Sequence, residues 1–297
     1  MEFGRLEFVW DLDFEFWNFN PACLRASIFP VQRRTEIPVA LTIAGSDSGG
    51  GAGVPADLKT FTALGVHGTC AITCLTAQNP RRVTRVEACS PKMLRAQIEA
   101  VFEELPPRAA KTGMLFSAAL IREVARMWRG RSCPLVVDPV MVATSGARLL
   151  QPEALRALTQ QLFPLAALVT PNVPEAEALL GMVIRAPEDL REAARKLHAR
   201  FGIAALVKGG HLHDAHESAD ILFDGETEWL LSSPRVRGVK THGTGCTFSA
   251  AIAAHLAHGE KLPRAVALAK QYVTNAIAST RRAGGHDVLW SPASRRT

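Results

Sequence analysis

The sequence has no long apolar stretch, no paired cysteine motif and no concentrated basic patch, and each absence removes a class of protein. No run approaches the ~18 uncharged apolar residues that a membrane-spanning helix requires, so we expect no membrane partner. The six cysteines, at positions 23, 70, 74, 89, 133 and 246, form neither a CxxC pair nor a zinc-ligand spacing. Unpaired thiols are typical of the reducing cytoplasm, which is the compartment we predict.

Basic residues are in excess but are spread along the chain. The formal net charge is +6 and the isoelectric point is about 9.2, with only short clusters such as Arg81-Arg82 and Arg281-Arg282. Because a nucleic-acid-binding domain usually concentrates its basic residues on one face, the sequence predicts no nucleic-acid partner. Its 297 residues, 47% hydrophobic and 21% charged, are sufficient for an ordinary globular core.

The first 36 residues differ in composition from the rest. They contain eight Phe and Trp residues interleaved with Glu and Asp, and no basic segment followed by a long apolar core, as a secretory signal would have. We interpret residues 1–36 as an extension that is disordered or absent from the native product; an amphipathic partner-binding segment is the alternative. We predict one folded domain over residues 37–290 and a flexible C-terminal tail over residues 291–297.

Strand-like and helix-like stretches alternate from Pro38 onward. The predicted strands cover residues 39–44, 67–76, 135–137, 167–169, 204–207, 218–223 and 228–231, and another strand-like piece ends near residue 111. The predicted helices cover residues 55–64, 91–105, 117–129, 152–162, 174–180 and 187–201, and two more begin at Gly245 and Arg264. Such alternation is typical of βαβ units, so the predicted fold class is α/β, with a mostly parallel central sheet and helices on both faces.

Polar side chains follow many of the predicted strands. Because ligands bind beyond the carboxyl ends of the strands in an open α/β sheet, these positions form a candidate site. Each also has a plainer interpretation: Asp138 can cap a turn, Glu175 can be a first-turn helix carboxylate, and Lys208 can be a solvated surface residue. The positions at or beyond strand ends are Asp57, Gln78, Met114, Asp138, Asn172, Glu175, Lys208 and Cys246.

The loop at residues 241–247 is a candidate anion-binding element. It reads Thr-His-Gly-Thr-Gly-Cys-Thr and leads directly into an apolar helical run over residues 248–256. The first N–H groups of a helix lack intrahelical partners and carry the positive end of the helix dipole. Because Gly243 and Gly245 have no side chains, the N–H groups of residues 243–246 can approach an oxyanion or a phosphoryl group. A glycine-rich turn with a Thr cap is the alternative.

Eight motifs in a fixed order carry a resemblance to a known family. They are AGSDSGGGAG at 44–53, ADLKTF at 56–61, TAQN at 76–79, KTGML at 111–115, DPVM at 138–141, TPNVPEAE at 170–177, VKGGH at 207–211 and HGTGCT at 242–247. From about residue 38 to residue 283 the chain resembles bacterial hydroxymethylpyrimidine and hydroxymethylpyrimidine-phosphate kinases. This thiamine-pathway branch of the ribokinase-like superfamily has a three-layer α/β/α fold. The chain departs from the usual pattern at Pro55, Pro80 and Val239-Lys240, where Gln, Thr and Lys-Asn are common.

The resemblance implies phosphorylation of 4-amino-5-hydroxymethyl-2-methylpyrimidine and then of its monophosphate, which gives the diphosphate used for thiamine. An amide side chain has both a donor and an acceptor, so Gln78 can pair twice with the amine and the adjacent ring nitrogen of the pyrimidine. Asp57 can accept a hydrogen bond from the amine, and Met114 and Val140 can form apolar walls. Gly45 completes the implied substrate site.

The resemblance also implies ATP as co-substrate and Mg²⁺ as cofactor. Asp138 and Glu175 are the expected metal ligands, because Mg²⁺ prefers carboxylate oxygens and usually bridges the phosphates of its nucleotide. Asn172, Lys208 and Lys240 are expected to bind the nucleotide.

Gly243, Thr244 and Gly245 are expected to be catalytic because their N–H groups hold the transferring phosphoryl group. Cys246 is the expected base for the hydroxymethyl proton, since a helix N-terminus lowers the pKa of a thiol. Two other functions remain open: a pyridoxine or pyridoxal kinase on the same fold, and a non-catalytic pyrimidine-binding sensor. Cys246 and Gln78 favour the pyrimidine, and the intact phosphate loop argues against a sensor. The family also implies a homodimer.

Overall fold

The computed structural model describes residues 36–141, 150–210, 217–239 and 242–290. The chain divides into two units, Met1–Glu36 and Ile37–Thr297, and every element named below belongs to the second. The predicted extension, apart from Glu36, and the predicted C-terminal tail lie outside the described residues. Among the helices of the described part, none is both long enough and apolar enough to cross a membrane.

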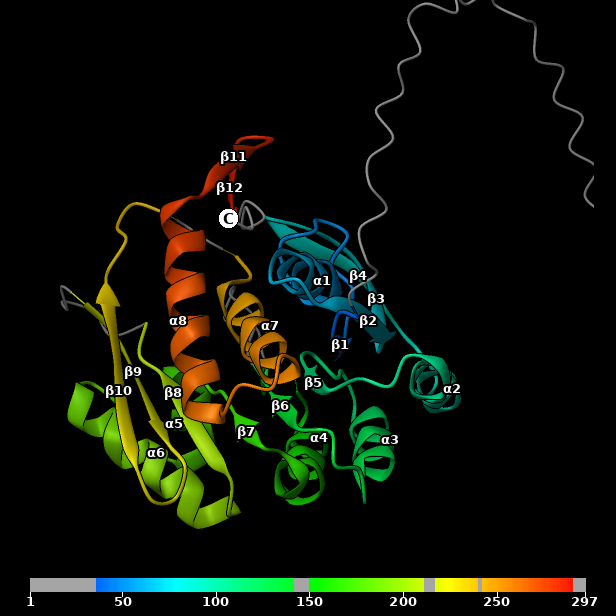
Figure 1. The fold of residues 1–297 in the computed structure, drawn as a ribbon, viewed down its shortest axis with the longest axis horizontal. Coiled ribbons are helices and arrows are strands. Elements are labelled where there is room, and N and C mark those ends of the chain that lie inside the picture. The colour runs from blue at the N-terminus through cyan, green and yellow to red at the C-terminus, as the bar shows by residue number, and fades with distance from the viewer. Residues whose placement is uncertain (1–35, 142–149, 211–216, 240–241, 291–297) are drawn as a thin grey trace, which may run out of the picture. The chain divides into compact units, whose positions relative to one another are not determined.

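An eight-stranded sheet runs through the second unit (Figure 1). The strands from β8 through β7, β6, β5 and β1 to β2 are parallel, and β9 and β10 extend one edge in antiparallel pairing, which confirms the predicted fold class. The strands are β1 Val39–Ala44, β2 His67–Ile72, β5 Ala109–Thr112, β6 Leu135–Val137, β7 Leu168–Val169, β8 Ala204–Lys208, β9 Glu217–Phe223 and β10 Glu228–Pro234.

Both faces of the sheet are buried because successive residues of a strand point to opposite faces. In β6, Leu135 and Val137 join one hydrophobic cluster and Val136 joins the other. Residues of β8 divide in the same way, with Val207 on the first face and Leu206 on the second. This arrangement explains why the parallel strands are nearly continuous apolar runs rather than alternating polar and apolar ones.

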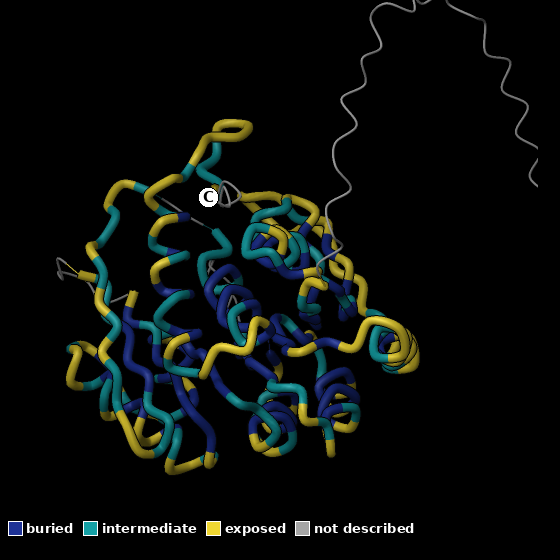
Figure 2. Tube along the Cα trace, viewed as in Figure 1, coloured by how far each residue is buried: buried dark blue, intermediate teal, exposed yellow. Residues whose placement is uncertain are grey.

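Helices cover both faces and complete the expected three layers. The helices whose buried residues join the second cluster are α1 Gly53–Ala63, α7 Thr244–Ala257 and α8 Leu262–Ala278. Those that join the first cluster are α2 Pro91–Glu104, α3 Ala118–Trp128, α4 Pro152–Ala157, α5 Val173–Leu180 and α6 Pro187–Phe201. Figure 2 shows the buried strands between helices whose outer faces are exposed. After α4 the chain continues as a short π-helix, Leu158–Leu162, and a 3₁₀ helix, Phe163–Leu165.

The predicted single strand over residues 67–76 is wrong. β2 ends at Ile72, and the chain then leaves the main sheet as β3, Cys74–Asn79, which pairs antiparallel with β4, Arg82–Ala88. The break occurs at Thr73, whose hydroxyl donates to the carbonyl oxygen of Met114. Asn79 forms the turn of the hairpin, because its side-chain oxygen accepts the N–H groups of residues 81 and 82. A second unpredicted hairpin, β11 Arg281–Ala283 with β12 His286–Val288, follows α8.

We expect a chain that begins at Ile37 to fold and to retain activity. The reason is that all described strands and helices belong to the unit that starts at that residue. Thermal unfolding of the full chain and of the shortened chain, together with their turnover, tests this expectation. A loss of activity, or a fall of many degrees in melting temperature, would show that residues 1–36 stabilise the domain.

Candidate active site

The glycine loop before α7 lies in direct backbone contact with the glycine loop after β1. Gly243 is the N-cap of α7 and has a φ of +87°, a conformation that suits glycine. A Cβ atom at Gly243 would lie 1.8 Å from the carbonyl oxygen of Gly51, so a side chain cannot fit there. Only glycine therefore allows the start of α7 to approach the first loop this closely.

Asp47 organises the loop after β1. Its two carboxylate oxygens accept the N–H groups of Gly49 at 2.8 Å, Gly51 at 3.1 Å and Ala52 at 2.8 Å. Burial by itself would raise the pKa of Asp47, but the neighbouring His242 and the bonds from these backbone groups leave the pKa below its usual value. The sequence predicted no role for Asp47, although Asp-Ser followed by three glycines is a recognisable turn signal.

Asp138, which follows β6, lies beneath the start of α7 and carries several bonds. Its Oδ1 accepts from Lys208 Nζ at 3.0 Å and from the Thr170 hydroxyl at 3.3 Å, and its Oδ2 accepts from the Ser249 hydroxyl at 3.2 Å. A Cβ at Gly245 would lie 3.4 Å from Lys208 Nζ and 3.8 Å from Asp138 Oδ2. The predicted phosphate loop, carboxylate and lysine are thus brought together by three separate segments.

Glu175 and Asn172 form a capping box at the N-terminus of α5. The Asn172 side chain accepts the Glu175 N–H at 3.0 Å, and Glu175 Oε2 accepts the Asn172 N–H at 3.0 Å. Glu175 Oε1 also accepts the N–H of Met141 at 3.1 Å. Burial raises the pKa of Glu175; Lys208 opposes the rise and Asp138 adds to it. Glu175 therefore does cap α5, as its plainer interpretation predicted. Both of its carboxylate oxygens still have lone pairs available for another ligand.

The carboxylate oxygens of Asp138 and Glu175 are ligands that suit Mg²⁺. Among the described residues no group of three or more His, Cys, Asp and Glu side chains could hold a metal, so a complete protein cage is absent there. Mg²⁺ usually takes only one or two carboxylates and completes its shell with waters and substrate phosphates. Asp138 and Glu175 are two buried carboxylates that act on each other electrostatically, and a cation would relieve this repulsion.

The Cys246 thiol does not have the lowered pKa that its place at a helix N-terminus predicted. Burial raises its pKa to about 11, although Lys111 and the Gly53 N–H act in the opposite direction. The expectation of an activated thiol is wrong for the protein without bound ligand, because loss of hydration outweighs the helix dipole.

A buried ion pair lies near Cys246. Lys111 Nζ donates to Asp57 Oδ2 at 3.0 Å, and the Thr42 hydroxyl donates to the same oxygen at 2.6 Å. All three residues are fully buried. Burial raises the pKa of Asp57, while Lys111 opposes the rise. No described group donates to Asp57 Oδ1, so a contact with the substrate amine stays a prediction.

The sequence predicted no role for Lys111, which is the first residue of the KTGML motif. It follows the two alanines of β5. A lysine at an interior position of an apolar strand indicates a buried anionic partner.

The residues predicted to contact the pyrimidine come from strand β3 and from the segments that follow β1, β5 and β6. The Gln78 amide nitrogen lies 3.2 Å from His242 Nε2. The Gly45 N–H donates to the Met114 carbonyl oxygen at 3.1 Å, and a Cβ at Gly45 would lie 2.7 Å from Met114 Cε. Val140 has a φ of +41°, which is strained for a β-branched residue, and strain of this kind concentrates at functional sites. Lys240 lies outside the described residues.

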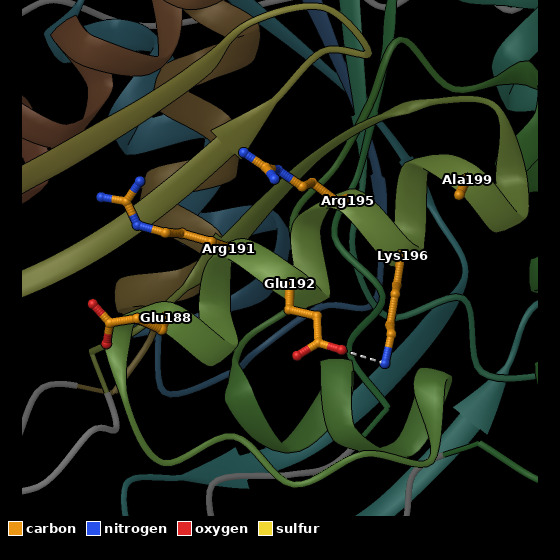
Figure 3. Close-up of a pocket in the computed structure, with 6 residues that line it drawn as sticks. All are labelled: Glu188, Arg191, Glu192, Arg195, Lys196 and Ala199. Carbon is orange, nitrogen blue, oxygen red and sulfur yellow. Dashed lines mark ion pairs between the residues drawn. The ribbon is translucent and has the colours of Figure 1, made fainter.

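A hollow of about 370 Å³ occurs on α6 but shares no residue with these groups (Figure 3). Four of its five charged side chains already have partners: Lys196 pairs with Glu192 at 2.6 Å, and Arg191 and Arg195 both pair with Glu228 of β10. We therefore assign it no role. The lining residues are Glu188, Arg191, Glu192, Arg195, Lys196 and Ala199.

Comparisons with known proteins agree with this arrangement. The family model for phosphomethylpyrimidine kinase matches residues 47–289. The hydroxymethylpyrimidine/phosphomethylpyrimidine kinase of Rhizobium meliloti is 51% identical over 247 residues, which cover 82% of this chain and 92% of that protein. The thiamine biosynthesis bifunctional protein ThiED of Geobacter sulfurreducens is 50% identical over 258 residues, which cover 86% of this chain but 52% of that protein.

Among solved structures, an ADP complex of Bacillus subtilis pyridoxal kinase superposes with a TM-score of 0.81 at 38% identity, covering 88% of this chain and 100% of that one. The ribokinase-like fold is thus shared with a pyridoxal kinase, and the Rhizobium meliloti relative, which has the higher identity, is a hydroxymethylpyrimidine/phosphomethylpyrimidine kinase. The chain spans about half of the bifunctional relative and nearly all of the single-function one. On this extent of similarity, the chain belongs to the phosphomethylpyrimidine kinase family.

Proposed function

We propose that this chain transfers the γ-phosphoryl group of ATP to the hydroxyl oxygen of hydroxymethylpyrimidine, and then to a phosphate oxygen of the resulting monophosphate. ADP leaves in each step, and the final product is the pyrimidine diphosphate used for thiamine. The observation that carries this proposal is the meeting of the α7 N-terminus with Asp138 and Lys208, where His242 also contacts Gln78 of β3. Family membership supports the substrate class.

The phosphate end of the site lies at residues 243–246. Phosphoryl transfer depends mainly on positioning and on neutralising charge, and backbone N–H groups at a helix N-terminus supply both. Burial acts to lower the pKa of Lys208, but the carboxylates of Asp138 and Glu175 outweigh burial and leave the pKa raised. Lys208 therefore stays positively charged and can interact with the phosphates. Asp138 and Glu175 would hold Mg²⁺, which neutralises phosphate charge when bound.

Two further residues are proposed for the nucleotide. Asn172 would hold the nucleotide side of the site, where it already bridges to Lys208 through the backbone. Lys240 keeps its predicted nucleotide contact as a proposal from the sequence alone.

The pyrimidine end of the site would be formed by Gln78, Gly45, Met114 and Val140. Gln78 presents a donor and an acceptor to the amine and ring nitrogen, and the absence of a Gly45 side chain keeps Met114 close to the loop. Asp57 Oδ1 is the further acceptor that we propose for the amine. A site built from hydrogen bonds of this kind discriminates strongly, because an analogue without the groups leaves buried polar atoms unpaired.

Cys246 is proposed as the base that accepts the hydroxymethyl proton. With a pKa of about 11 its thiolate population at pH 7 is about 10⁻⁴, so the thiolate is scarce but strongly basic. Lys111, which acts on Cys246 electrostatically, favours the thiolate form. Because the transition state is loose, the anion hole contributes more than the base.

Cytoplasmic location and a homodimer complete the proposal. The described cysteines are all unpaired, which suits a reducing compartment with ready ATP. The β3–β4 hairpin exposes Leu75, Val83 and Val86, and apolar side chains of this kind support pairing with a second copy. Sedimentation equilibrium of the wild-type chain tests the dimer.

A coupled assay of ADP release tests the function. The wild-type chain is assayed with hydroxymethylpyrimidine, with its monophosphate and with pyridoxal, each in the presence of Mg²⁺ and after addition of EDTA. We expect turnover with both pyrimidines, weaker turnover with pyridoxal, and loss of activity in EDTA that Mg²⁺ restores. Preference for pyridoxal would establish the pyridoxal kinase alternative. Binding of pyrimidine without any ADP release would establish the sensor.

Replacing Gln78 by Leu is expected to weaken pyrimidine binding selectively. The substitution keeps the bulk but removes the donor and the acceptor, and each unpaired buried group costs roughly 1–3 kcal/mol. We expect a rise in KM for hydroxymethylpyrimidine with ATP affinity nearly unchanged, measured by steady-state kinetics and by calorimetry. Equal losses for both ligands would mean that Gln78 is structural.

Substitutions at Cys246 and Gly245 separate the base from the anion hole. In Cys246→Ser the backbone N–H groups stay but the ionisable thiol is lost, which should cost roughly 10²–10⁴ in turnover if the thiolate is the base. Gly245→Val keeps the thiol and crowds Lys208, so we expect a loss that is also severe.

The pH profile provides the control for that comparison. Below a pKa of about 11 the thiolate fraction rises with pH, so the wild-type rate should rise from pH 6 to 9 while the Ser variant stays flat. The Ser variant should still bind ATP and pyrimidine by calorimetry. Near-wild-type turnover of Cys246→Ser across this range would remove the thiol from the mechanism.

A further inference from the structure

Three side chains from three separate segments meet beside the phosphate loop. His242 Nε2 lies 3.2 Å from the amide nitrogen of Gln78 in β3 and 3.5 Å from Asp47 Oδ2 in the loop after β1. His242 directly precedes the N-cap glycine of α7, and its ring also limits the space at Gly51, where a Cβ would lie 3.2 Å from His242 Cδ2. The Gln78 amide, which is proposed to bind the pyrimidine, is therefore linked to the proposed phosphate loop through the imidazole of His242.

The proton arrangement of this contact follows from the inventory of donors. The amide nitrogen of Gln78 has two N–H groups and no acceptor, so His242 Nε2 must accept. The tautomer that makes this contact carries its proton on Nδ1. The Asp47 carboxylate does not require this nitrogen as a donor, because it already accepts three backbone N–H groups at 3.1 Å or less. Its separation of 3.5 Å from Nε2 is also longer than an ordinary N–H to oxygen bond.

The backbone of Gln78 is held separately. Its N–H donates to the Ser48 hydroxyl at 2.8 Å, and the Ser48 hydroxyl donates to its carbonyl oxygen at 2.7 Å. This pair of bonds fixes where the residue lies but leaves its side-chain amide able to turn over. The two ends of an amide have nearly the same shape and opposite hydrogen-bonding character, so a turn of the amide would present the wrong end to a ligand.

We propose that His242 is a positioning residue that sets substrate specificity by fixing the orientation of the Gln78 amide. The imidazole accepts one N–H of Gln78. The second N–H then faces the ring nitrogen of the pyrimidine, and the amide oxygen faces the exocyclic amine. The inference rests on the proposed pairing of Gln78 with the pyrimidine, and it adds that this pairing depends on His242. Asp47 contributes indirectly, by holding the loop against which His242 packs.

A double-substitution cycle tests the dependence. His242→Phe keeps a flat ring but removes the acceptor, and the loss of one neutral hydrogen bond corresponds to a rise of about threefold to tenfold in KM for the pyrimidine. We expect kcat and ATP affinity to change less than about twofold. In the Gln78→Leu background the same His242→Phe substitution should have no further effect on KM, because the group it positions is already absent.

Two more variants serve as controls. His242→Gln can place an amide oxygen near the former Nε2 position, so it should restore most of the pyrimidine affinity. His67→Phe changes an exposed histidine at the start of β2 and should leave KM unchanged. Melting temperatures of all variants identify any that fail to fold. If His242→Phe fails to fold, His242→Leu, which also lacks the acceptor, replaces it in the cycle.

A second readout measures selectivity. The wild-type chain should discriminate against an analogue in which a methyl group replaces the amine, and His242→Phe should discriminate less. The proposal is overturned if His242→Phe raises KM equally with and without Gln78, or if KM and selectivity do not change. If the wild-type chain prefers pyridoxal, the proposed function fails, and the same cycle run on pyridoxal still measures the coupling of the two residues.

Discussion

The contact between the Gly51 carbonyl oxygen and the backbone of Gly243 is the steric constraint on which the candidate site depends. It holds the loop after β1 against the N-terminus of α7 with no side chain between them. Asp47 shapes the first loop with three backbone bonds, and the sheet places Asp138 and Lys208 beneath the second. An anion hole of backbone N–H groups works only when no side chain intrudes, so the glycines at this contact are required by geometry.

The carboxyl ends of the parallel strands hold more buried charged side chains than the rest of the described residues. Lys111 pairs with Asp57, and Lys208 pairs with Asp138 next to Glu175. Removing such groups from water is costly, and replacing them with apolar residues commonly stabilises a protein. Their presence therefore supports the proposed binding of charged ligands here, because fixed charges in a poorly hydrated site act strongly on a phosphoryl group.

The sequence predicted the layers well because its parallel strands are buried on both faces and are separated by capped, periodic helices. β6 and α6 were predicted with their observed bounds, and the residues that follow the strands do gather at one edge. The β3–β4 hairpin was missed even though Val83, Thr84 and Val86 are β-branched residues that favour a strand, because the β-branched run before it looked like one long strand.

Contacts between residues far apart in the chain could not be predicted from the sequence. The pair of Lys111 with Asp57 joins positions 54 residues apart, and the contact of Gln78 with His242 joins positions 164 apart. The raised pKa of Cys246 was also unpredictable, since it depends on how completely the folded chain excludes water from the thiol.

That exclusion of water has a consequence for redox chemistry. Oxidants such as peroxide attack the thiolate, and reactivity of a cysteine follows its thiolate population and its exposure. With a pKa of about 11, Cys246 presents very little thiolate at neutral pH, although it lies at a helix N-terminus where cysteines are commonly reactive. The burial that raises the pKa of this thiol thus also protects it from oxidation, so a cysteine at the N-terminus of α7 can stay reduced without a repair system.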